Sequence, residues 1–378
     1  MLQKKTKAAA AALLLALPLA VSACGQSGGT SGGGGSAGNS AGNSAGTNAT
    51  GSTDTNASGS ATIALLLPET ATSARYETQD RPDFEQTVQQ LAPNIKVIYN
   101  NAQGNATTQQ QQAEAAITNG AKVLVLDPVD SKAAATIVNE AQQAGVKVIS
   151  YDRLITGANV DYYVSFDNEK VGQLQGQYIA DHTPKGGTVV MIDGAQTDNN
   201  ALLFAKGAHD VLDPLFANGT LKKGYETYTP DWLPANGQRE MEQALTQLNN
   251  KVDGVLVAND GLAGAVIQAL RAQGLAGKVP VTGQDATDAG LHNILQGLQS
   301  MTVYKAVKQE AEAAAKLAVA LAQGQQPDAS LINGKVNNGT KDVPSVLLTP
   351  VVVTKDNIQD TVIKDGYTTM DKINAAKS

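Results

Sequence analysis

Short apolar runs and longer amphipathic segments alternate along much of this chain. The run 61–67 has the length of a buried strand, and helical spacing places Phe84, Val88 and Leu91 on one face of the segment that follows. Two more pairs of an apolar run and an amphipathic segment come before residue 145. Repeats of this kind with short connections predict a parallel sheet covered by helices on both faces.

The alternation breaks where two apolar runs, 146–150 and 162–166, follow each other without a helix between them. The polar sequence Asp167-Asn168-Glu169 then signals a helix start, and the strand and helix pattern begins again. A restart of this kind predicts that the chain passes here from one α/β domain into a second one.

Two later apolar runs, 301–304 and 346–353, fit further passages between the domains, so that three strands would form a hinge. Each domain is then discontinuous in sequence. The predicted first domain comprises residues 61–165 and 303–346, and the predicted second domain comprises residues 166–302 and 347–378.

Residues 1–23 have the features of a secretory signal rather than of a folded element. Lysines at positions 4, 5 and 7 precede an apolar segment that is too short to span a bilayer, and small residues follow it. The chain's 1 Cys, Cys24, comes directly after them, and this arrangement resembles the lipobox of bacterial lipoproteins, whose Cys is acylated. A free thiol beside a different cleavage site is the alternative. We expect an extracytoplasmic protein held by lipid at the outer face of the cell membrane.

Residues 24–60 consist almost entirely of Gly, Ser, Ala, Asn and Thr without apolar periodicity, which predicts a disordered linker between the lipidated Cys24 and the folded part. The whole chain has 28 Lys and Arg against 35 Asp and Glu, a formal net charge of −7. Removal of the lysine-bearing signal makes the remaining chain more acidic still. This balance argues against a nucleic-acid partner and against electrostatic attachment to a membrane.

Polar and aromatic side chains follow the predicted strands at their carboxyl ends, where α/β sheets bind ligands. They are Arg75, Tyr76, Asp152, Arg153, Asn199, Asn200, Asn259, Asp260, Gln284, Asp285 and Lys305, with Trp232 in a loop. Guanidinium, amide and carboxylate groups match the hydroxyls of a sugar, and aromatic rings match its apolar C–H faces. Taken singly, such residues have plainer interpretations: Asn259 as a helix N-cap, Asp285 as a turn residue and Trp232 as a packed aromatic.

The sequence shows no machinery for catalysis. Its 3 His, at positions 182, 209 and 292, are not spaced as ligands of one metal ion. No nucleophile elbow, Walker motif or zinc motif occurs in the folded part. We therefore expect a binding protein without catalytic residues, metal or cofactor.

Beyond single residues, much of the sequence between positions 61 and about 367 looks familiar. The segments concerned are Tyr151-Asp152-Arg153, Ser165 to Gly172, Asp198 to Ala201, Trp232-Leu233-Pro234, Asn259-Asp260, Ile267 to Leu270, Gly283 to Ala286, Met301 to Lys305, Lys341 to Ser345 and Asp360 to Gly366. Together they make the chain similar to the type I periplasmic sugar-binding proteins that serve ABC importers, and within them to the bacterial D-xylose-binding proteins.

The resemblance implies a type I periplasmic-binding-protein fold, in which a three-strand hinge joins two parallel-sheet α/β domains. It also implies which side chains bind the sugar. Hydrogen bonds to the sugar hydroxyls would come from Arg75, Arg153, Asn200, Asn259, Asp285 and Lys305, with Trp232 stacked on the ring. Tyr76 stands beside Arg75, where the resemblance leads us to expect Trp, and would keep an aromatic face there.

The function that the resemblance implies is capture of D-xylose outside the cell and its delivery to a membrane ABC permease, by a monomer. A broader aldose-binding protein that reports to a chemoreceptor or sensor kinase is the alternative. A transcriptional regulator of the same fold would need a helix-turn-helix at its N-terminus, where this sequence has a signal and a linker. A sugar-modifying enzyme would need an acid and base pair, and it would turn over its ligand.

The position of Cys24 leads to a test of the membrane anchor. Cys24→Ser should abolish lipid attachment, because the chain has no other Cys, and should leave the signal uncleaved or release the protein from the membrane. Incorporation of a labelled lipid precursor measures the modification. A wild-type protein that takes up no label would contradict the prediction.

Overall fold

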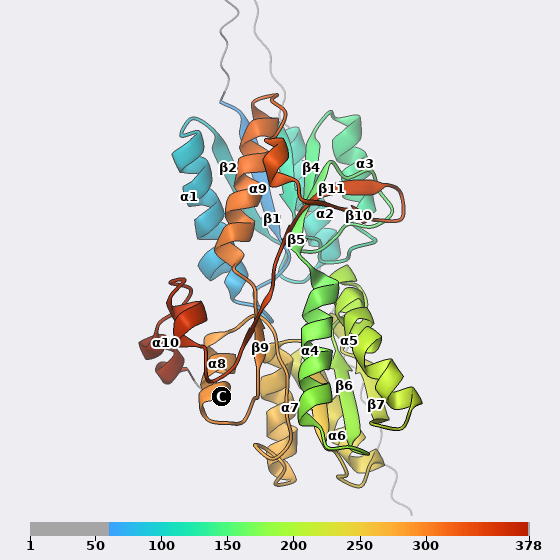
Figure 1. Ribbon diagram of the computed structural model, residues 1–378. Coiled ribbons are helices and arrows are strands. Elements are labelled where there is room, and N and C mark those ends of the chain that lie inside the picture. Colours follow the sequence, from blue (N-terminus) through green and yellow to red (C-terminus); the bar gives the residue numbers. More distant parts are fainter. Residues whose placement is uncertain (1–59, 377–378) are drawn as a thin grey trace, which may run out of the picture. The chain divides into compact units, whose positions relative to one another are not determined.

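The computed structural model describes residues 60–376 of the chain (Figure 1). The expected signal segment 1–23, Cys24 and nearly all of the expected linker 24–60 lie outside the described residues. No helix among residues 60–376 has both the length and the apolar character that crossing a membrane requires. The described part of the chain forms two α/β lobes, each built on its own sheet.

The first lobe is built on a seven-stranded sheet with the order β10-β11-β5-β4-β3-β1-β2. In chain order its strands are β1 (Thr62–Leu67), β2 (Lys96–Asn101), β3 (Ala121–Leu126), β4 (Lys147–Tyr151), β5 (Tyr162–Phe166), β10 (Gly334–Asn337) and β11 (Asp342–Leu348). Neighbouring strands are parallel except β10 and β11, which pair antiparallel. The sequence analysis did not anticipate this edge hairpin, which follows from a connection of only residues 338–341, too short for a parallel crossover.

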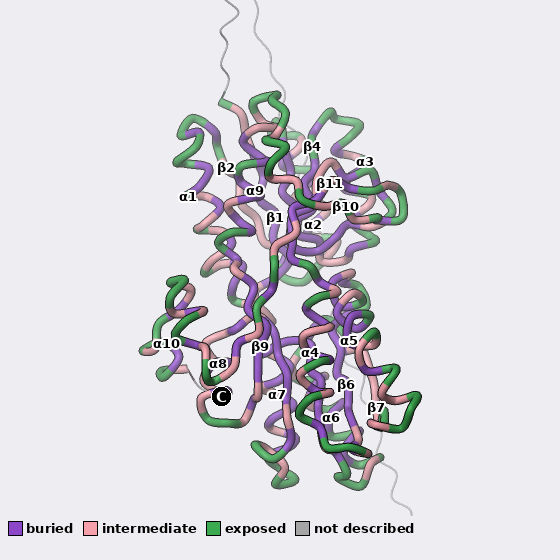
Figure 2. Tube along the Cα trace, viewed as in Figure 1, coloured by how far each residue is buried: buried purple, intermediate pink, exposed green. Residues whose placement is uncertain are grey.

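Helices cover both faces of this sheet, as the strand and helix pattern predicts. They are α1 (Arg81–Leu91), α2 (Ala106–Thr118), α3 (Ala135–Gln143) and α9 (Val307–Ala322), with the short turn η3 (Ala329–Leu331) after α9. Ile63 and Leu65 of β1 lie in a core with α1 and α9, whereas Ala64 and Leu66 lie in a second core with α2 and α3. Successive residues of one strand therefore enter different cores, which explains why the whole strand is apolar. Buried residues follow the strands in Figure 2.

The second lobe is built on a three-stranded parallel sheet with the order β7-β6-β8. Its elements are α4 (Asn168–His182), β6 (Thr188–Asp193), α5 (Asn199–Ala217), β7 (Lys222–Tyr228), α6 (Pro234–Gln247), β8 (Gly254–Val257), α7 (Asp260–Ala272) and α8 (Asp288–Leu295). In the pattern that begins again after residue 167, the apolar run 279–283 predicts a further strand; this prediction is wrong, because the structure has there only a single bridge between Val255 and Val281. The Thr282 hydroxyl takes the place of a backbone partner, since its Oγ accepts from Val257 N at 2.8 Å and donates to Val257 O at 3.0 Å.

Three connections join the lobes (Figure 1). The chain leaves the first lobe from β5 into α4, returns from β9 (Thr302–Tyr304) into α9, and leaves again from β11 into β12 (Val351–Val353). β9 and β12 pair antiparallel with each other. The last segment, with η4 (Gln359–Ile363) and α10 (Met370–Ala375), shares a small separate core with α8.

Two glycines allow α4 and α5 to approach each other closely. A Cβ added at Gly172 of α4 would lie 1.9 Å from the carbonyl oxygen of Phe204, and one added at Gly207 of α5 would lie 2.0 Å from the carbonyl oxygen of Glu169. Each helix thus places a glycine against the backbone of the other. This contact fixes the first turn of α5, which carries Asn200 into the region between the lobes.

Gly207→Ala should lower the free energy of unfolding by about 1–3 kcal/mol, because the added methyl group forces the two helices apart. The matched control is Gly264→Ala in α7, where no atom lies within 4 Å of the added Cβ. That control should raise the stability by about 0.5–1 kcal/mol, since alanine is the better helix former. Denaturant unfolding compares the two variants, and equal effects would show that α4 and α5 do not meet at these glycines.

Candidate functional site

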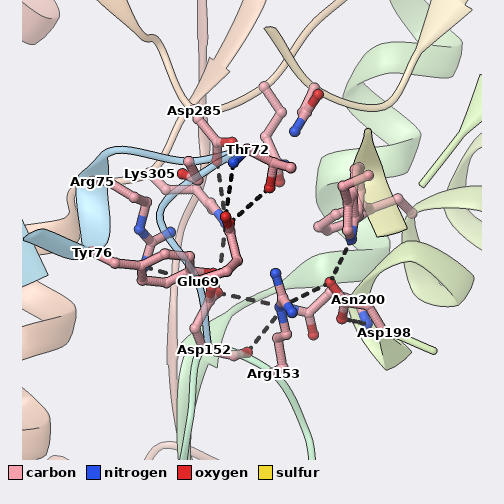
Figure 3. A pocket seen from close by; sticks show the side chains of 15 residues that line it. Glu69, Thr72, Arg75, Tyr76, Asp152, Arg153, Asp198, Asn200, Asp285 and Lys305 are labelled. Carbon is pink, nitrogen blue, oxygen red and sulfur yellow. Dashed lines mark hydrogen bonds and ion pairs between the residues drawn. The ribbon is translucent and has the colours of Figure 1, made fainter. Parts of the chain in front are cut away.

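A small cavity lies between the lobes, at the carboxyl ends of the strands (Figure 3). Its walls are formed by Glu69, Thr72, Ser73, Arg75, Tyr76, Asp152, Arg153, Asp198, Asn200, Phe204, Trp232, Asn259, Gln284, Asp285 and Lys305. All eight residues that the sequence analysis assigned to sugar binding are among them. The structure therefore brings these side chains, which come from separate loops of both lobes, to one place.

Carboxylates outside the cavity bind part of the Arg75 guanidinium, and the rest of this group lines the cavity. It precedes the short turn η1 (Tyr76–Asp80), which places Asp80 so that Nε and Nη2 donate to it at 3.0 and 2.8 Å. Nη2 also donates to Glu310 of α9 at 2.9 Å. Burial lowers the pKa of Arg75, but the nearby carboxylates outweigh it and hold the pKa well above its ordinary value. The N–H groups of Nη1 have no acceptor among residues 60–376, so they can serve a ligand.

Asp152 is the centre of the first-lobe wall. Its backbone has a φ of 52°, and its carbonyl oxygen accepts from Tyr163 at 3.0 Å and from Ser165 at 2.6 Å. Its carboxylate accepts from the Tyr76 hydroxyl at 3.2 Å and lies 3.6 Å from Arg75 Nη2. Burial raises the pKa of this carboxyl, yet the cations Arg75, Lys305 and Arg153 outweigh burial and hold the pKa below its ordinary range. Asp152 is therefore a charged acceptor inside the cavity wall.

Asp198 joins the two lobes at the other side of the cavity. Its carboxylate lies 3.1 Å from Arg153 Nε of the first lobe and accepts from the Trp232 indole N–H at 3.2 Å. It also caps α5 by accepting from Asn200 N at 2.8 Å. One carboxylate thus orients an arginine, the indole and the helix that carries Asn200.

The position of Trp232 depends on a strained turn and on a glycine. Asp231 and Trp232, in the turn η2 (Pro230–Trp232), have φ values of 57° and 56°. A Cβ added at Gly194 would lie 2.0 Å from the indole ring, so only glycine leaves room for the ring. The indole is 7% exposed. It forms an apolar wall of the cavity together with Phe204.

Asn259 and Asp285 complete the cavity on the second-lobe side, and Lys305 lies at the connection between the lobes. Asn259 Oδ1 accepts from Leu262 N at 2.9 Å and so caps α7, while the Asn259 amide N–H groups have no acceptor among the described residues. Lys305 Nζ lies 3.5 Å from Asp285 and 3.6 Å from Asp152. Burial lowers the pKa of Lys305, but these two carboxylates raise it above its ordinary value. The ammonium group therefore stays charged between the lobes.

Direct hydrogen bonds also cross from one lobe to the other beside the cavity. Asn200 Nδ2 donates to the Asp152 carbonyl at 3.0 Å, and Ser131 N donates to the Thr197 carbonyl at 2.9 Å. Asn199 N donates to Ser131 Oγ at 3.0 Å. Asn199, which the sequence analysis placed at a strand end, therefore serves the contact between the lobes rather than the cavity wall.

Sequence reasoning did not select several residues that line the cavity. Glu69 and Thr72 belong to the loop after β1, where Thr72 donates to Glu69 from both its N–H, at 2.8 Å, and its hydroxyl, at 2.7 Å. Asp198 could have been noticed from its place before Asn199 and Asn200, which is a helix-capping pattern. Glu69 left no such signal, because a single acid in a polar loop is ordinary.

The comparison with known sequences identifies the class of protein that this fold and cavity form. Residues 63–326 match the periplasmic binding protein domain family, and the match covers more than half of the chain. The chain therefore belongs to this family of binding proteins.

Three similar proteins illustrate the relationship. The D-xylose-binding periplasmic protein of Escherichia coli (strain K12) is 47% identical over 289 residues, 76% of this chain and 86% of the relative. The multiple sugar-binding periplasmic receptor of Rhizobium radiobacter is 34% identical, over 84% of this chain and 93% of the relative. The crystal structure of a carbohydrate transporter solute binding protein from Chloroflexus aurantiacus, in complex with D-glucose, is 36% identical with a TM-score of 0.74, over 82% of this chain and 97% of that one. These matches confirm the predicted fold class and resemblance, and none of the three names describes an enzyme.

Proposed function

We propose that this protein binds D-xylose in the cavity between its lobes and delivers it to a membrane ABC permease. The observation that carries the proposal is that guanidinium, carboxylate and amide groups and an indole ring line one small cavity. The relatives support the choice of ligand, since the protein that is 47% identical is named for D-xylose.

The geometry suits an aldose because each of its hydroxyls can both donate and accept a hydrogen bond. Asp152 and Asp285 supply acceptors, and Arg75 and Lys305 supply donors on the same side. Lys305 lies beyond hydrogen-bond distance from both carboxylates, so a hydroxyl can bond to either neighbour without breaking a short contact. Trp232 offers the apolar face on which the C–H groups of a sugar ring pack.

We further propose that the lobes close on the sugar. The lobes would comprise residues 61–165 with 303–346 and residues 166–302 with 347–378. Arg75 and Arg153 come from the first and Asn259 and Asp285 from the second, with Lys305 at the connection between them. Neither lobe alone can satisfy all hydroxyls, so ligand binding favours the closed arrangement over an open one.

We also propose how the protein is attached to the membrane and in which oligomeric state it acts. Cys24 would carry lipid, residues 24–60 would be a tether, and the protein would act as a monomer at the outer face of the membrane. The tether would let the lobes reach the permease while lipid prevents their loss.

A broader aldose receptor is the second candidate. The relative from Rhizobium radiobacter is named a multiple sugar-binding receptor, and Glu69, Thr72 and Ser73 add further polar groups to the cavity wall. Competition between D-xylose and other aldoses separates the two candidates.

Calorimetric titration of the purified protein with D-xylose tests the proposal. Arg153→Ala and Asp285→Ala should each weaken binding by roughly 30-fold to 1,000-fold, because buried partners lose their hydrogen bonds. Arg239→Ala is the matched control: Arg239 is exposed and donates only to Asn236, so its loss should leave the affinity unchanged. The sugar should be recovered unaltered. Wild-type affinity in both site variants would place the site elsewhere.

Small-angle scattering tests closure. D-xylose should reduce the radius of gyration of the protein, and the emission of Trp232, the only tryptophan, should change with the same saturation curve. Bound sugar should also raise the free energy of unfolding by about 2.7 kcal/mol at a hundredfold excess over Kd. Saturable binding without any change in the radius of gyration, in a protein shown to be open beforehand, would refute closure.

A further inference from the structure

The turn that carries Asp285 has an unusual backbone. Asp285 and Ala286 have φ values of 91° and 49°, a region that residues with a side chain rarely adopt. The Asp285 carboxylate lines the cavity, and Ala286 is fully buried. Strained turns of this kind persist only where neighbouring groups hold them in place.

Groups outside the cavity hold this turn from several sides. The Tyr367 hydroxyl donates to the Asp285 carbonyl at 2.8 Å. Asp285 N donates to the Val303 carbonyl at 2.9 Å, and Ala286 N donates to Thr302 Oγ at 3.1 Å. β9 thus fixes the backbone N–H groups of Asp285 and Ala286, and the C-terminal segment fixes the Asp285 carbonyl group.

The Asp260 carboxylate supports the same turn through hydrogen bonds. Its carboxylate accepts from Thr287 N at 2.8 Å and from Gln299 Nε2 at 2.7 Å. A Cβ added at Gly283 or at Gly290 would lie 2.2 Å from a carboxylate oxygen of Asp260. These two glycines therefore leave the space that the Asp260 side chain fills. Asp260 does not line the cavity, although it follows Asn259 directly.

Tyr367 also connects the turn to Lys305. Its ring packs edge to face against Tyr304, with centroids 4.9 Å apart. Tyr304 precedes Lys305, whose ammonium group lies 3.5 Å from the Asp285 carboxylate. Tyr367 therefore stabilises the positions of both Asp285 and Lys305.

We propose that Tyr367 and Asp260 are positioning residues that set sugar affinity by holding the Asp285 turn, without touching the sugar. The proposal rests on the proposed function, in which Asp285 accepts from a sugar hydroxyl. Without the hydrogen bonds from Tyr367 and to Asp260 the turn relaxes, and the Asp285 carboxylate no longer points into the cavity.

Tyr367→Phe gives the first test, because it removes one hydroxyl and keeps the ring packed on Tyr304. The affinity for D-xylose, measured by calorimetry on the purified protein, should fall about five- to tenfold. Tyr225→Phe is the matched control, since among the described residues the Tyr225 hydroxyl bonds only to the exposed Gln243 in the second lobe, and its affinity should equal that of the wild type.

Asp260→Asn gives a second test that does not depend on the C-terminal segment. It keeps the shape of the side chain but turns an N–H₂ group toward a donor, so affinity should fall about tenfold or more. Asp253→Asn is its control: Asp253 accepts from Thr188 N at 2.8 Å, before the amino end of β8 and far from the cavity. This control should lower the melting temperature and leave the affinity unchanged.

A double-mutant cycle separates positioning from general stability. If Tyr367 and Asp260 act through Asp285, adding either substitution to Asp285→Asn should weaken binding little further. Full additivity, or wild-type affinity in both single variants, would overturn the proposal while leaving the function intact. A wild-type protein that binds no D-xylose would overturn the proposed function and this inference with it.

Discussion

Buried charge is the constraint on which this site depends. Arg75, Arg153 and Lys305 are almost fully removed from water, and a buried cation without partners costs several kcal/mol. Carboxylates therefore surround each of them, and Arg75 lies within 4 Å of three, those of Asp80, Asp152 and Glu310. Burial raises the pKa of Glu310 well above its ordinary value, and the neighbouring Asp152 adds to this, although Arg75 acts in the opposite direction.

The same ion pairs also join the two lobes. Asp198 lies 3.1 Å from Arg153 across the cavity, and Lys305 lies between Asp152 and Asp285. These contacts belong to both lobes, so their energy depends on how the lobes meet. In the proposed function, a ligand with several hydroxyls would bond to the same groups from both sides, so that recognition of the ligand and closure of the lobes would be one event.

Several residues serve the fold and the site together. Asn259 caps α7 through Oδ1, which confirms the plain interpretation for this atom, while the proposed function concerns its amide N–H groups. Asp198 likewise caps α5 and orients Trp232. A substitution at such a position would change stability and, in the proposed function, binding at once.

The sequence by itself determined most of the order of strands and helices, apart from the antiparallel edge strand β10, and the candidates at strand ends, such as Arg153 and Asp285, because burial in a parallel sheet leaves a local periodic pattern. It failed at 279–283, where the Thr282 hydroxyl replaces a backbone partner. Only the tertiary structure decided that Asp198 joins Arg153 and that Tyr367 holds the Asp285 turn. Such contacts join residues far apart in the chain, and a strained φ depends on the packing around it, so neither leaves a pattern in the local sequence.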